Sequence, residues 1–364
     1  MLLNGRDART IWPEPDGAAI GVIDQRLLPH RVAVARIASA DDAARAIANM
    51  TVRGAPLIGV TAAYGLALQA RANASDGALH AAATMLKAAR PTAVNLGWAI
   101  ERTLQEMRTL PRTGRAAVAW ASAGKLADAD VKCNQAIGRH GLALLCELAA
   151  RRRGERLDIL THCNAGWLAT VDWGTALAPI YMAQREGVPI HVWVDETRPR
   201  NQGASLTAFE LREQGVPHTV IADNAAGHLM QRGQVDAVIV GCDRVTARGD
   251  VANKIGTYLK ALAAHDCGVP FYVAMPLSTL DRSLDDGLTG IRIEERSPRE
   301  VTHMTGRSPR GEIVEVQIVP EGTQAANPAF DVTPARLVTA LVTELGVVPA
   351  TAKGLASLTG RSDA

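Results

Sequence analysis

The segment that follows the apolar run Val238–Val240 carries the densest group of chemically useful side chains in the chain. These side chains are Asp243, Arg244, Asp250, Asn253 and Lys254. Ligands of open α/β sheets bind beyond the carboxyl ends of the strands, so a polar group in this position is a candidate site. Asp243 at a strand end can be partly desolvated, which raises its pKa and suits acid–base catalysis. The alternative is that Asp243 caps the next turn or pairs with Arg244.

Asn253 and Lys254 stand at the beginning of a helical pattern that we predict from about Lys254 to His265. The N-terminus of a helix offers free backbone N–H groups, and a lysine beside it can complete a phosphate site. Taken alone, the pair is more typical of an N-cap followed by a surface lysine.

A second predicted strand, Leu157–Thr161, leads into a turn that contains His162, Cys163 and Asn164. A buried cysteine on an apolar face is usually an inert hydrophobic residue, but Cys163 stands in a turn. Backbone N–H groups of such a turn can lower the pKa of a thiol and make it reactive. Adjacent residues of a strand point to opposite faces, so we interpret His162 as structural and Cys163 as the candidate.

Two arginines come shortly before predicted helices that a proline would start, in Arg53-Gly54-Ala55-Pro56 and in Arg90-Pro91. Proline suits the first helical position, and arginine binds phosphate through two parallel hydrogen bonds. The small residues Gly54 and Ala55 allow the backbone to approach a ligand closely. A third strand end, at Asp195, leads to Gln202, which opens a further helix. We expect the two arginine segments to form an oxyanion-binding wall, although either arginine alone is more typical of a solvated side chain. The third strand end would feed the same crevice, and its alternative is a charged surface loop.

The motifs of common cofactor sites are missing from the sequence. No glycine-rich dinucleotide or P-loop pattern stands at a strand–helix turn, and no nucleophile-elbow serine motif is present. The five cysteines, an odd number, include no Cys-x-x-Cys pair, which argues against a zinc site or a disulfide framework. We therefore expect a site with no metal and no cofactor.

The spacing of apolar residues predicts the elements that must position these side chains. Residues 8–38 read as two or three short strands, and residues 39–150 read as alanine-rich helices, the first capped by Ser39. After residue 154, short apolar strands alternate with helices. This alternation predicts an α/β fold with a doubly wound parallel sheet. We divide the chain into an N-terminal helical domain with a short sheet, residues 1–130, and a Rossmann-like catalytic domain, residues 131–364.

Composition narrows the class of protein further. The 364 residues are 47% hydrophobic and 21% charged, as in ordinary globular proteins, and the formal net charge is only +2. A small net charge argues against a nucleic-acid partner, which would require clustered basic residues. No apolar stretch is long enough to span a membrane, and the N-terminus lacks the apolar core of a signal peptide. We expect a cytoplasmic protein.

Taken together, the sequence motifs resemble those of the S-methyl-5-thioribose-1-phosphate isomerase family, the aldose–ketose isomerases of methionine salvage. The resemblance covers nearly the whole chain. It lies in Asp24-Gln25-Arg26-Leu27-Leu28-Pro29, Arg53-Gly54-Ala55-Pro56, Arg90-Pro91-Thr92, Thr161-His162-Cys163-Asn164, Glu196-Thr197-Arg198-Pro199 with Gln202-Gly203, Gly241-Cys242-Asp243-Arg244, Asn253-Lys254-Ile255-Gly256-Thr257, Ile293-Glu294-Glu295-Arg296 and the segment from Asn327 to Pro334. The superfamily also holds ribose-1,5-bisphosphate isomerases and non-catalytic regulatory subunits of a translation-initiation exchange factor.

The resemblance implies a role for each candidate residue. Asp243 would be the general acid/base and Cys163 the second catalytic residue, and this pair favours the enzyme branch. The substrate, a sugar phosphate, would be contacted by Arg53, Gly54, Ala55, Arg90, Gln202, Asn253 and Lys254. The family fold is a small helical domain followed by a Rossmann-like domain, in a homodimer. After Gln202-Gly203-Ala204 the family pattern leads us to expect arginine, but this chain has Ser205. The departure leaves the preferred substituent at C5 of the sugar open, so 5-deoxyribose 1-phosphate and ribose 1,5-bisphosphate are alternative substrates.

Overall fold

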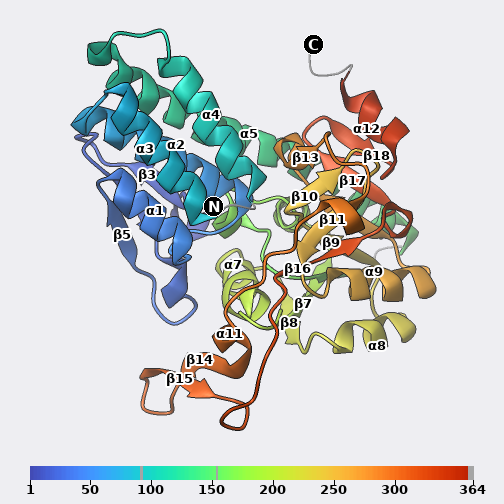
Figure 1. Cartoon of the computed structure of the whole chain (residues 1–364). Helices are drawn as coiled ribbons and strands as arrows, with labels where there is room; N and C mark the ends of the chain where they lie inside the picture. Colours follow the sequence, from blue (N-terminus) through green and yellow to red (C-terminus); the bar gives the residue numbers. More distant parts are fainter. Residues whose placement is uncertain (91–92, 153–154, 360–364) are drawn as a thin grey trace.

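The N-terminal part of the chain combines helices with two small antiparallel sheets (Figure 1). The computed structural model describes residues 1–90, 93–152 and 155–359. The strands are β1 (Leu2–Leu3), β2 (Arg6–Asp7), β3 (Ile11–Pro13), β4 (Ile20–Ile23) and β5 (Val34–Ile37), and the helices are η1 (Gln25–Leu27), α1 (Ala40–Ala48), α2 (Ala55–Ala72), α3 (Asp76–Ala89), α4 (Val94–Met107) and α5 (Arg112–Arg151). The predicted strands in residues 8–38 and the helical character of residues 39–150 are confirmed.

Local sequence explains how the first helices begin. The Ser39 hydroxyl accepts a hydrogen bond from the backbone N–H of Asp42 at 3.1 Å, which caps α1 as predicted. Helix α2 is apolar on all sides because α1, α4 and α5 pack around it. The helix is therefore packed firmly within the helical layer.

A seven-stranded sheet forms the centre of the rest of the chain, with the order β18-β17-β12-β9-β6-β7-β8. Its members are β6 (Leu157–Thr161), β7 (Ile190–Asp195), β8 (His218–Ile221), β9 (Ala237–Val240), β12 (Phe271–Ala274), β17 (Ala340–Thr343) and β18 (Gly346–Val348). All neighbours pair in parallel except β17 and β18. Counted along the chain, the six parallel strands have the Rossmann order 3-2-1-4-5-6, and the direction of the winding reverses between β6 and β9.

Helices cover both faces of this sheet, as a doubly wound fold requires. Along β9, Ile239 packs in an apolar cluster with α5, α6 (Ala178–Arg185) and α7 (Ala208–Glu213). The next residue, Val240, packs on the opposite side with α8 (Ala225–Gln231), α9 (Thr257–Asp266) and α12 (Ala352–Thr359). Because successive residues point to opposite faces, a continuous apolar strand serves both clusters. The predicted fold class is confirmed.

A second, four-stranded sheet was not predicted. It has the order β13-β10-β11-β16, formed by β10 (Arg244–Thr246), β11 (Val251–Lys254), β13 (Leu280–Asp281) and β16 (Phe330–Thr333). The expectation that Asn253 and Lys254 open a helix is wrong, because both lie on β11 and α9 begins only at Thr257. The physical reason is the pairing of β11 with β16, nearly 80 residues later, in which Lys254 lies opposite Phe330.

The remaining elements connect or extend these layers. They are η2 (Trp167–Ala169), the π-helical turn η3 (Gly203–Thr207), η4 (Leu277–Thr279), α10 (Gly287–Gly290), α11 (Arg299–Thr302), β14 (His303–Arg307), β15 (Ile313–Gln317) and η5 (Ala335–Leu337). Strands β14 and β15 form a hairpin that extends away from the main body at the bottom of Figure 1. Within the described residues, no helix combines the length and apolar character needed to cross a membrane.

The predicted division after residue 130 falls inside the long helix α5. Val131 still packs with the N-terminal helices, whereas Ile137 and Leu145 pack against the seven-stranded sheet. One helix thus joins the two apolar clusters, and the boundary at residues 130 and 131 stays a prediction.

Candidate active site

The residues predicted from the sequence line a single cavity at the point where the winding of the sheet reverses. Cys163 follows the carboxyl end of β6, and Asp243 follows that of the neighbouring strand β9. The cavity has a volume of about 80 Å³. Its lining includes all nine candidates, namely Arg53, Gly54, Ala55, Arg90, Cys163, Gln202, Asp243, Asn253 and Lys254. Such a switch point is where ligands bind in open α/β sheets.

Cys163 is held in an unusual backbone conformation, with φ at +67°. Its N–H donates to the Thr197 hydroxyl at 2.8 Å, and its carbonyl accepts from the Thr207 hydroxyl at 2.7 Å. Burial raises the pKa of the thiol, and the charges of Arg53 and Lys254 oppose this rise without cancelling it. The expectation of a turn that lowers the thiol pKa is therefore only partly met, because the backbone N–H of Asn164 contributes in that direction but burial outweighs it.

Asp243 is placed by its backbone, whose N–H donates to the carbonyl of Ala252 on β11 at 2.9 Å. Burial raises the pKa of its carboxyl group against the opposing charges of Lys254, Arg90 and Arg53. Arg244 turns away and forms an ion pair with Asp281 at 3.6 Å. A carboxyl group in this setting retains its proton to a higher pH than an exposed aspartate does.

Strand β11 brings two polar side chains into the cavity wall. Lys254 is only 7% exposed, and its ammonium group lies 4.8 Å from the ring centre of Phe330. Burial lowers the pKa of Lys254, and the neighbouring Cys163 and Asp243 counteract this shift. The Asn253 amide donates to the Thr257 hydroxyl at 3.0 Å, which joins the strand to the first turn of α9.

The start of α2 presents Arg53, Gly54 and Ala55, with proline in the first turn as predicted. Gly54 has φ at +90°, and a Cβ atom added there would lie 2.1 Å from the carbonyl oxygen of Ala169. Only glycine fits this position. The Arg53 guanidinium donates to both the side-chain oxygen and the backbone carbonyl of Asn164, 2.7 Å for the carbonyl, so it is fixed beside Cys163.

Arg90 and Gln202 complete the predicted set. Arg90 stands at the end of α3 and forms an ion pair with Glu294 at 3.3 Å. Helix α4 begins at Val94 after its N-cap Ala93, so the expectation that a proline starts this helix is wrong, and Pro91 itself lies outside the described residues. Gln202 is buried, and within the described part of the chain its side-chain oxygen has no hydrogen-bond partner.

Glu210 is a site-supporting residue that the sequence did not reveal. It is fully buried on α7, and one of its oxygens accepts from the Asn164 amide at 2.9 Å. It also accepts from the backbone N–H groups of Trp167 and Leu168, both at 2.9 Å. A hydrogen-bonded chain thus runs from Glu210 through Asn164 to Arg53. A glutamate in a helical pattern gives no sign that it faces inward, so no sequence signal could have identified it.

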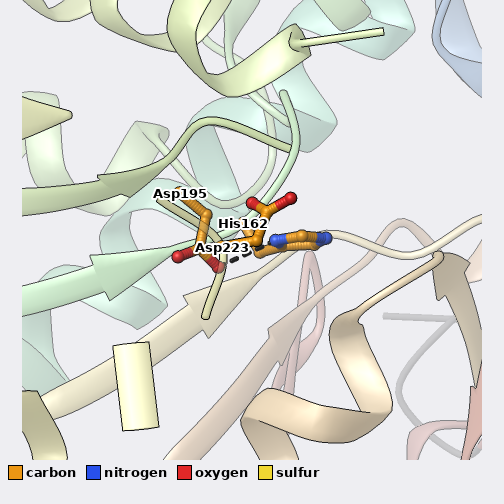
Figure 2. Close-up of side chains that lie close together, drawn as sticks. All are labelled: His162, Asp195 and Asp223. Carbon is orange, nitrogen blue, oxygen red and sulfur yellow. Dashed lines mark hydrogen bonds and ion pairs between the residues drawn. The ribbon is translucent and has the colours of Figure 1, made fainter. Parts of the chain in front are cut away.

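His162, which also lines the cavity, lies close to Asp195 and Asp223 (Figure 2), near enough for their ligand atoms to share a metal ion. Most of these ligand atoms already have partners within the described residues, although Asp195 Oδ1 has no hydrogen-bond partner there. His162 contacts Asp195 and the carbonyl of Ile255 with its two ring nitrogens, each at 2.8 Å. Asp223 accepts from two backbone N–H groups, and the ammonium group of Lys260 lies 3.3 Å from Asp195. Lys260 supplies the positive charge that a metal would bring. The two contacts of the His162 ring support its interpretation as a structural residue.

The cavity therefore combines three cations with two proton-carrying groups. Arg53, Arg90 and Lys254 can neutralise a phosphate, and Asp243 and Cys163 can transfer protons. Each of the five comes from a different segment, and the parallel sheet and the packed start of α2 bring them together.

Comparisons with known proteins agree with this arrangement. Residues 51–350 match the model of the Initiation factor 2 subunit family. The chain is 62% identical to methylthioribose-1-phosphate isomerase of Methylobacterium nodulans, with 98% of each chain covered. It is 58% identical to the protein of that name from Rhodospirillum rubrum, over 98% of this chain and 93% of the relative.

Solved structures give the same result. The crystal structure of 5-methylthioribose 1-phosphate isomerase from Pyrococcus horikoshii OT3 matches with a TM-score of 0.84 and 40% identity, covering 98% of this chain and 96% of that one. The translation initiation factor eIF-2B subunit delta from A. fulgidus matches with a TM-score of 0.79 and 37% identity, covering 97% and 100%. The chain therefore belongs to the methylthioribose-1-phosphate isomerase family, within the Initiation factor 2 subunit family.

Proposed function

We propose that this protein converts S-methyl-5-thioribose 1-phosphate into S-methyl-5-thioribulose 1-phosphate in methionine salvage. The observation that carries the proposal is the cavity in which Asp243 and Cys163 lie among three cationic side chains. Relatives named methylthioribose-1-phosphate isomerase, 62% and 61% identical to this chain, support the choice of substrate. We further propose that the enzyme works in the cytoplasm as a homodimer, without a metal or cofactor.

The phosphate on the anomeric carbon determines what the enzyme must do. Because this carbon is blocked, the ring cannot open spontaneously, and the ring oxygen requires a proton. We assign this step to Asp243, whose buried carboxyl group has a raised pKa and so retains the proton that it must donate. The phosphate is assigned to Arg53, Arg90 and Lys254, with Gly54 and Ala55 at the start of α2 offering backbone N–H groups.

The hydrogen at C2 must then move to C1, and two routes are available. In the first, Cys163 removes the proton from C2 and returns it to C1 through an enolate, with Arg53 and Lys254 stabilising the thiolate. In the second, the hydrogen moves directly as a hydride, and Cys163 only shapes the site. The raised pKa of Cys163 means that the first route must begin with loss of a proton from a thiol that burial keeps neutral.

The test is to follow the purified chain with S-methyl-5-thioribose 1-phosphate by proton and phosphorus NMR. We expect conversion to the ketose phosphate, and the reaction in D₂O distinguishes the two routes. Deuterium at C1 of the product supports the proton-transfer route, whereas complete retention of the original hydrogen supports the hydride shift.

A regulatory, non-catalytic protein is the second candidate, favoured by the 37% identity to the protein titled eIF-2B subunit delta. It predicts no turnover of any sugar phosphate by the purified chain. Comparison of kcat/KM for the 5-methylthio sugar, 5-deoxyribose 1-phosphate and ribose 1,5-bisphosphate then decides which isomerase activity the chain has.

A further inference from the structure

A larger cavity adjoins the catalytic one. Its volume is about 510 Å³, compared with about 80 Å³ for the catalytic cavity. Pockets for small ligands are typically several hundred Å³, which the larger cavity matches. We call the larger space the outer vestibule, and the two cavities share Met50, Arg53 and Gln202 as lining residues.

The shared residues indicate where the substrate extends. Arg53 is assigned to the phosphate, whereas Gln202 is a proposed substrate contact that is not, so another part of the substrate can reach the wall common to the two cavities at Gln202. A third cavity, of about 460 Å³, shares only Pro56 and Pro276 with the catalytic one, and neither is a proposed contact. The phosphate at C1 and the substituent at C5 lie at opposite ends of the ribose. With the phosphate turned toward Arg90 and Lys254, which do not line the outer vestibule, the 5-substituent can pass Gln202 into it.

The lining of the outer vestibule combines apolar side chains with an excess of arginines. Leu206 and the shared Met50 are both buried, and each can contact an alkyl chain. Five of its lining residues are arginines, whereas only two, Glu300 and Glu315, are acidic. Arg200 and Arg299 are paired with these two glutamates, so the exposed Arg31 adds positive charge to the lining.

Ser205 also lines the outer vestibule. A serine leaves open the space that a long side chain on this turn of η3 would fill. The outer vestibule thus has space for a chain, apolar side chains that can contact it, and an excess of arginines. These features suit a subsite for an extended acidic group.

We propose that the site accepts 5-thioribose 1-phosphates whose sulfur carries a chain longer than methyl, and that it prefers chains ending in a carboxylate. This inference rests on the proposed isomerase function. The phosphate and the reacting carbons remain in the catalytic cavity, the chain contacts Met50 and Leu206, and the carboxylate meets the charge of Arg31.

The experiment compares kcat/KM for three substrates that carry 5-S-methyl, 5-S-butyl and 5-S-(3-carboxypropyl) groups. We expect both longer substrates to be used within about tenfold of the methyl compound, since a pocket with space does not reject added methylenes. At low ionic strength the carboxypropyl substrate should exceed the butyl one about threefold or more, and high salt should reduce this ratio. Arg31→Ala should reduce the same ratio about threefold, whereas the same change at Arg232, an exposed arginine directly after α8, should not.

Rejection of both longer substrates by more than about a hundredfold, with the methyl compound still converted, would overturn the inference. So would a preference for butyl over carboxypropyl, or a ratio that Arg31→Ala leaves unchanged. Ser205→Leu should lower kcat/KM for both longer substrates more than for the methyl one, and an equal effect on all three would also count against it. A chain that converts none of the three substrates contradicts the proposed isomerase function itself.

Discussion

At the scale of single residues, burial and charge act against each other in the catalytic cavity. Burial raises the pKa of Asp243 and lowers that of Lys254, and each group's charge opposes the shift of the other. Both shifts favour the neutral forms. A bound phosphate dianion would favour the charged form of Lys254 and the protonated form of Asp243, which is the state that the proposed first step needs.

Asp243→Asn should be the most damaging single change. Asparagine keeps the shape and hydrogen-bonding capacity but cannot donate a proton to the ring oxygen, and general acid catalysis contributes about 10²–10⁴-fold. We expect kcat to fall by about two orders of magnitude or more, with KM and the melting temperature little changed. Steady-state kinetics and calorimetry provide the measurement. A variant with normal kcat and a much lower melting temperature would identify Asp243 as a structural cap.

Cys163→Ser should lose most activity without unfolding. The serine hydroxyl is nearly isosteric but far less acidic than the thiol, so it cannot form the anion that the proton-transfer route requires. Activity and circular dichroism are measured beside Cys267→Ser, whose thiol stands at the end of α9 away from the catalytic cavity. Full activity of the Cys163 variant would leave this residue a packing role and favour the hydride route.

Lys254→Ala should weaken substrate binding. Loss of one charge-assisted contact to the phosphate costs about 1.5–3 kcal/mol, seen as a raised KM. The control is Lys125→Ala, an exposed lysine on α5. If Lys254→Ala leaves KM and kcat/KM unchanged, the phosphate is bound elsewhere.

At the scale of elements, the start of α2 is the part of the scaffold with the tightest geometry. Gly54 has positive φ, and its Cα faces the backbone of Ala169 so closely that no side chain fits. This contact places Arg53 and the first turn of α2 against the loop after β6 that carries Cys163. The helix start and the strand end therefore form one unit.

Gly54→Ala should lower both activity and stability, because the new Cβ would force the helix start away from Ala169. Gly97→Ala, on α4, is the matched control, since a Cβ there meets nothing within 4 Å. In a helix interior this control change should stabilise by about 0.5–1 kcal/mol. Denaturant unfolding and kcat/KM are measured for both variants, and equal behaviour of the two would show that the close contact is unimportant.

At the scale of the whole molecule, Asp130 on α5 joins the helical layer to the loop before α6. Its carboxylate accepts from the backbone N–H of Val171 at 2.7 Å, and burial raises its pKa to about 7 from the ordinary 3.8. The native state thus keeps a proton that the unfolded chain releases. The stability that this group contributes is present below pH 3.8 and is lost as the pH rises through about 7.

Asp130→Asn should flatten this dependence, because the amide does not titrate. We expect the melting temperature of the wild type to fall relative to that of the variant as the pH rises from about 4 to about 8. Asp128→Asn, at an exposed position of the same helix, is the control and should leave the profile unchanged. A constant difference across this range would show that Asp130 has no raised pKa in the folded protein.

The sequence by itself determined the fold class and the residues to examine. Continuous apolar strands such as Ala237–Val240 predict a sheet covered on both faces. Only a strand buried on both faces is apolar at successive positions, since these point to opposite sides. A polar loop directly after two of these strands marked Cys163 and Asp243, since the carboxyl ends of parallel strands meet at one edge. The start of α2 was equally visible, because proline and glycine have local conformational preferences.

Only the tertiary structure decided features that depend on contacts between distant segments. Lys254 lies on a strand and not on a helix because β11 pairs with β16, and the residue pattern around Lys254 contains no trace of that partner. Glu210 supports Arg53 through Asn164 because α7 packs against the loop after β6. The pKa of Cys163 rises because burial exceeds the effect of its neighbours' charges. Pairing, packing and burial arise from the folded chain as a whole, so a local pattern of residues cannot specify them.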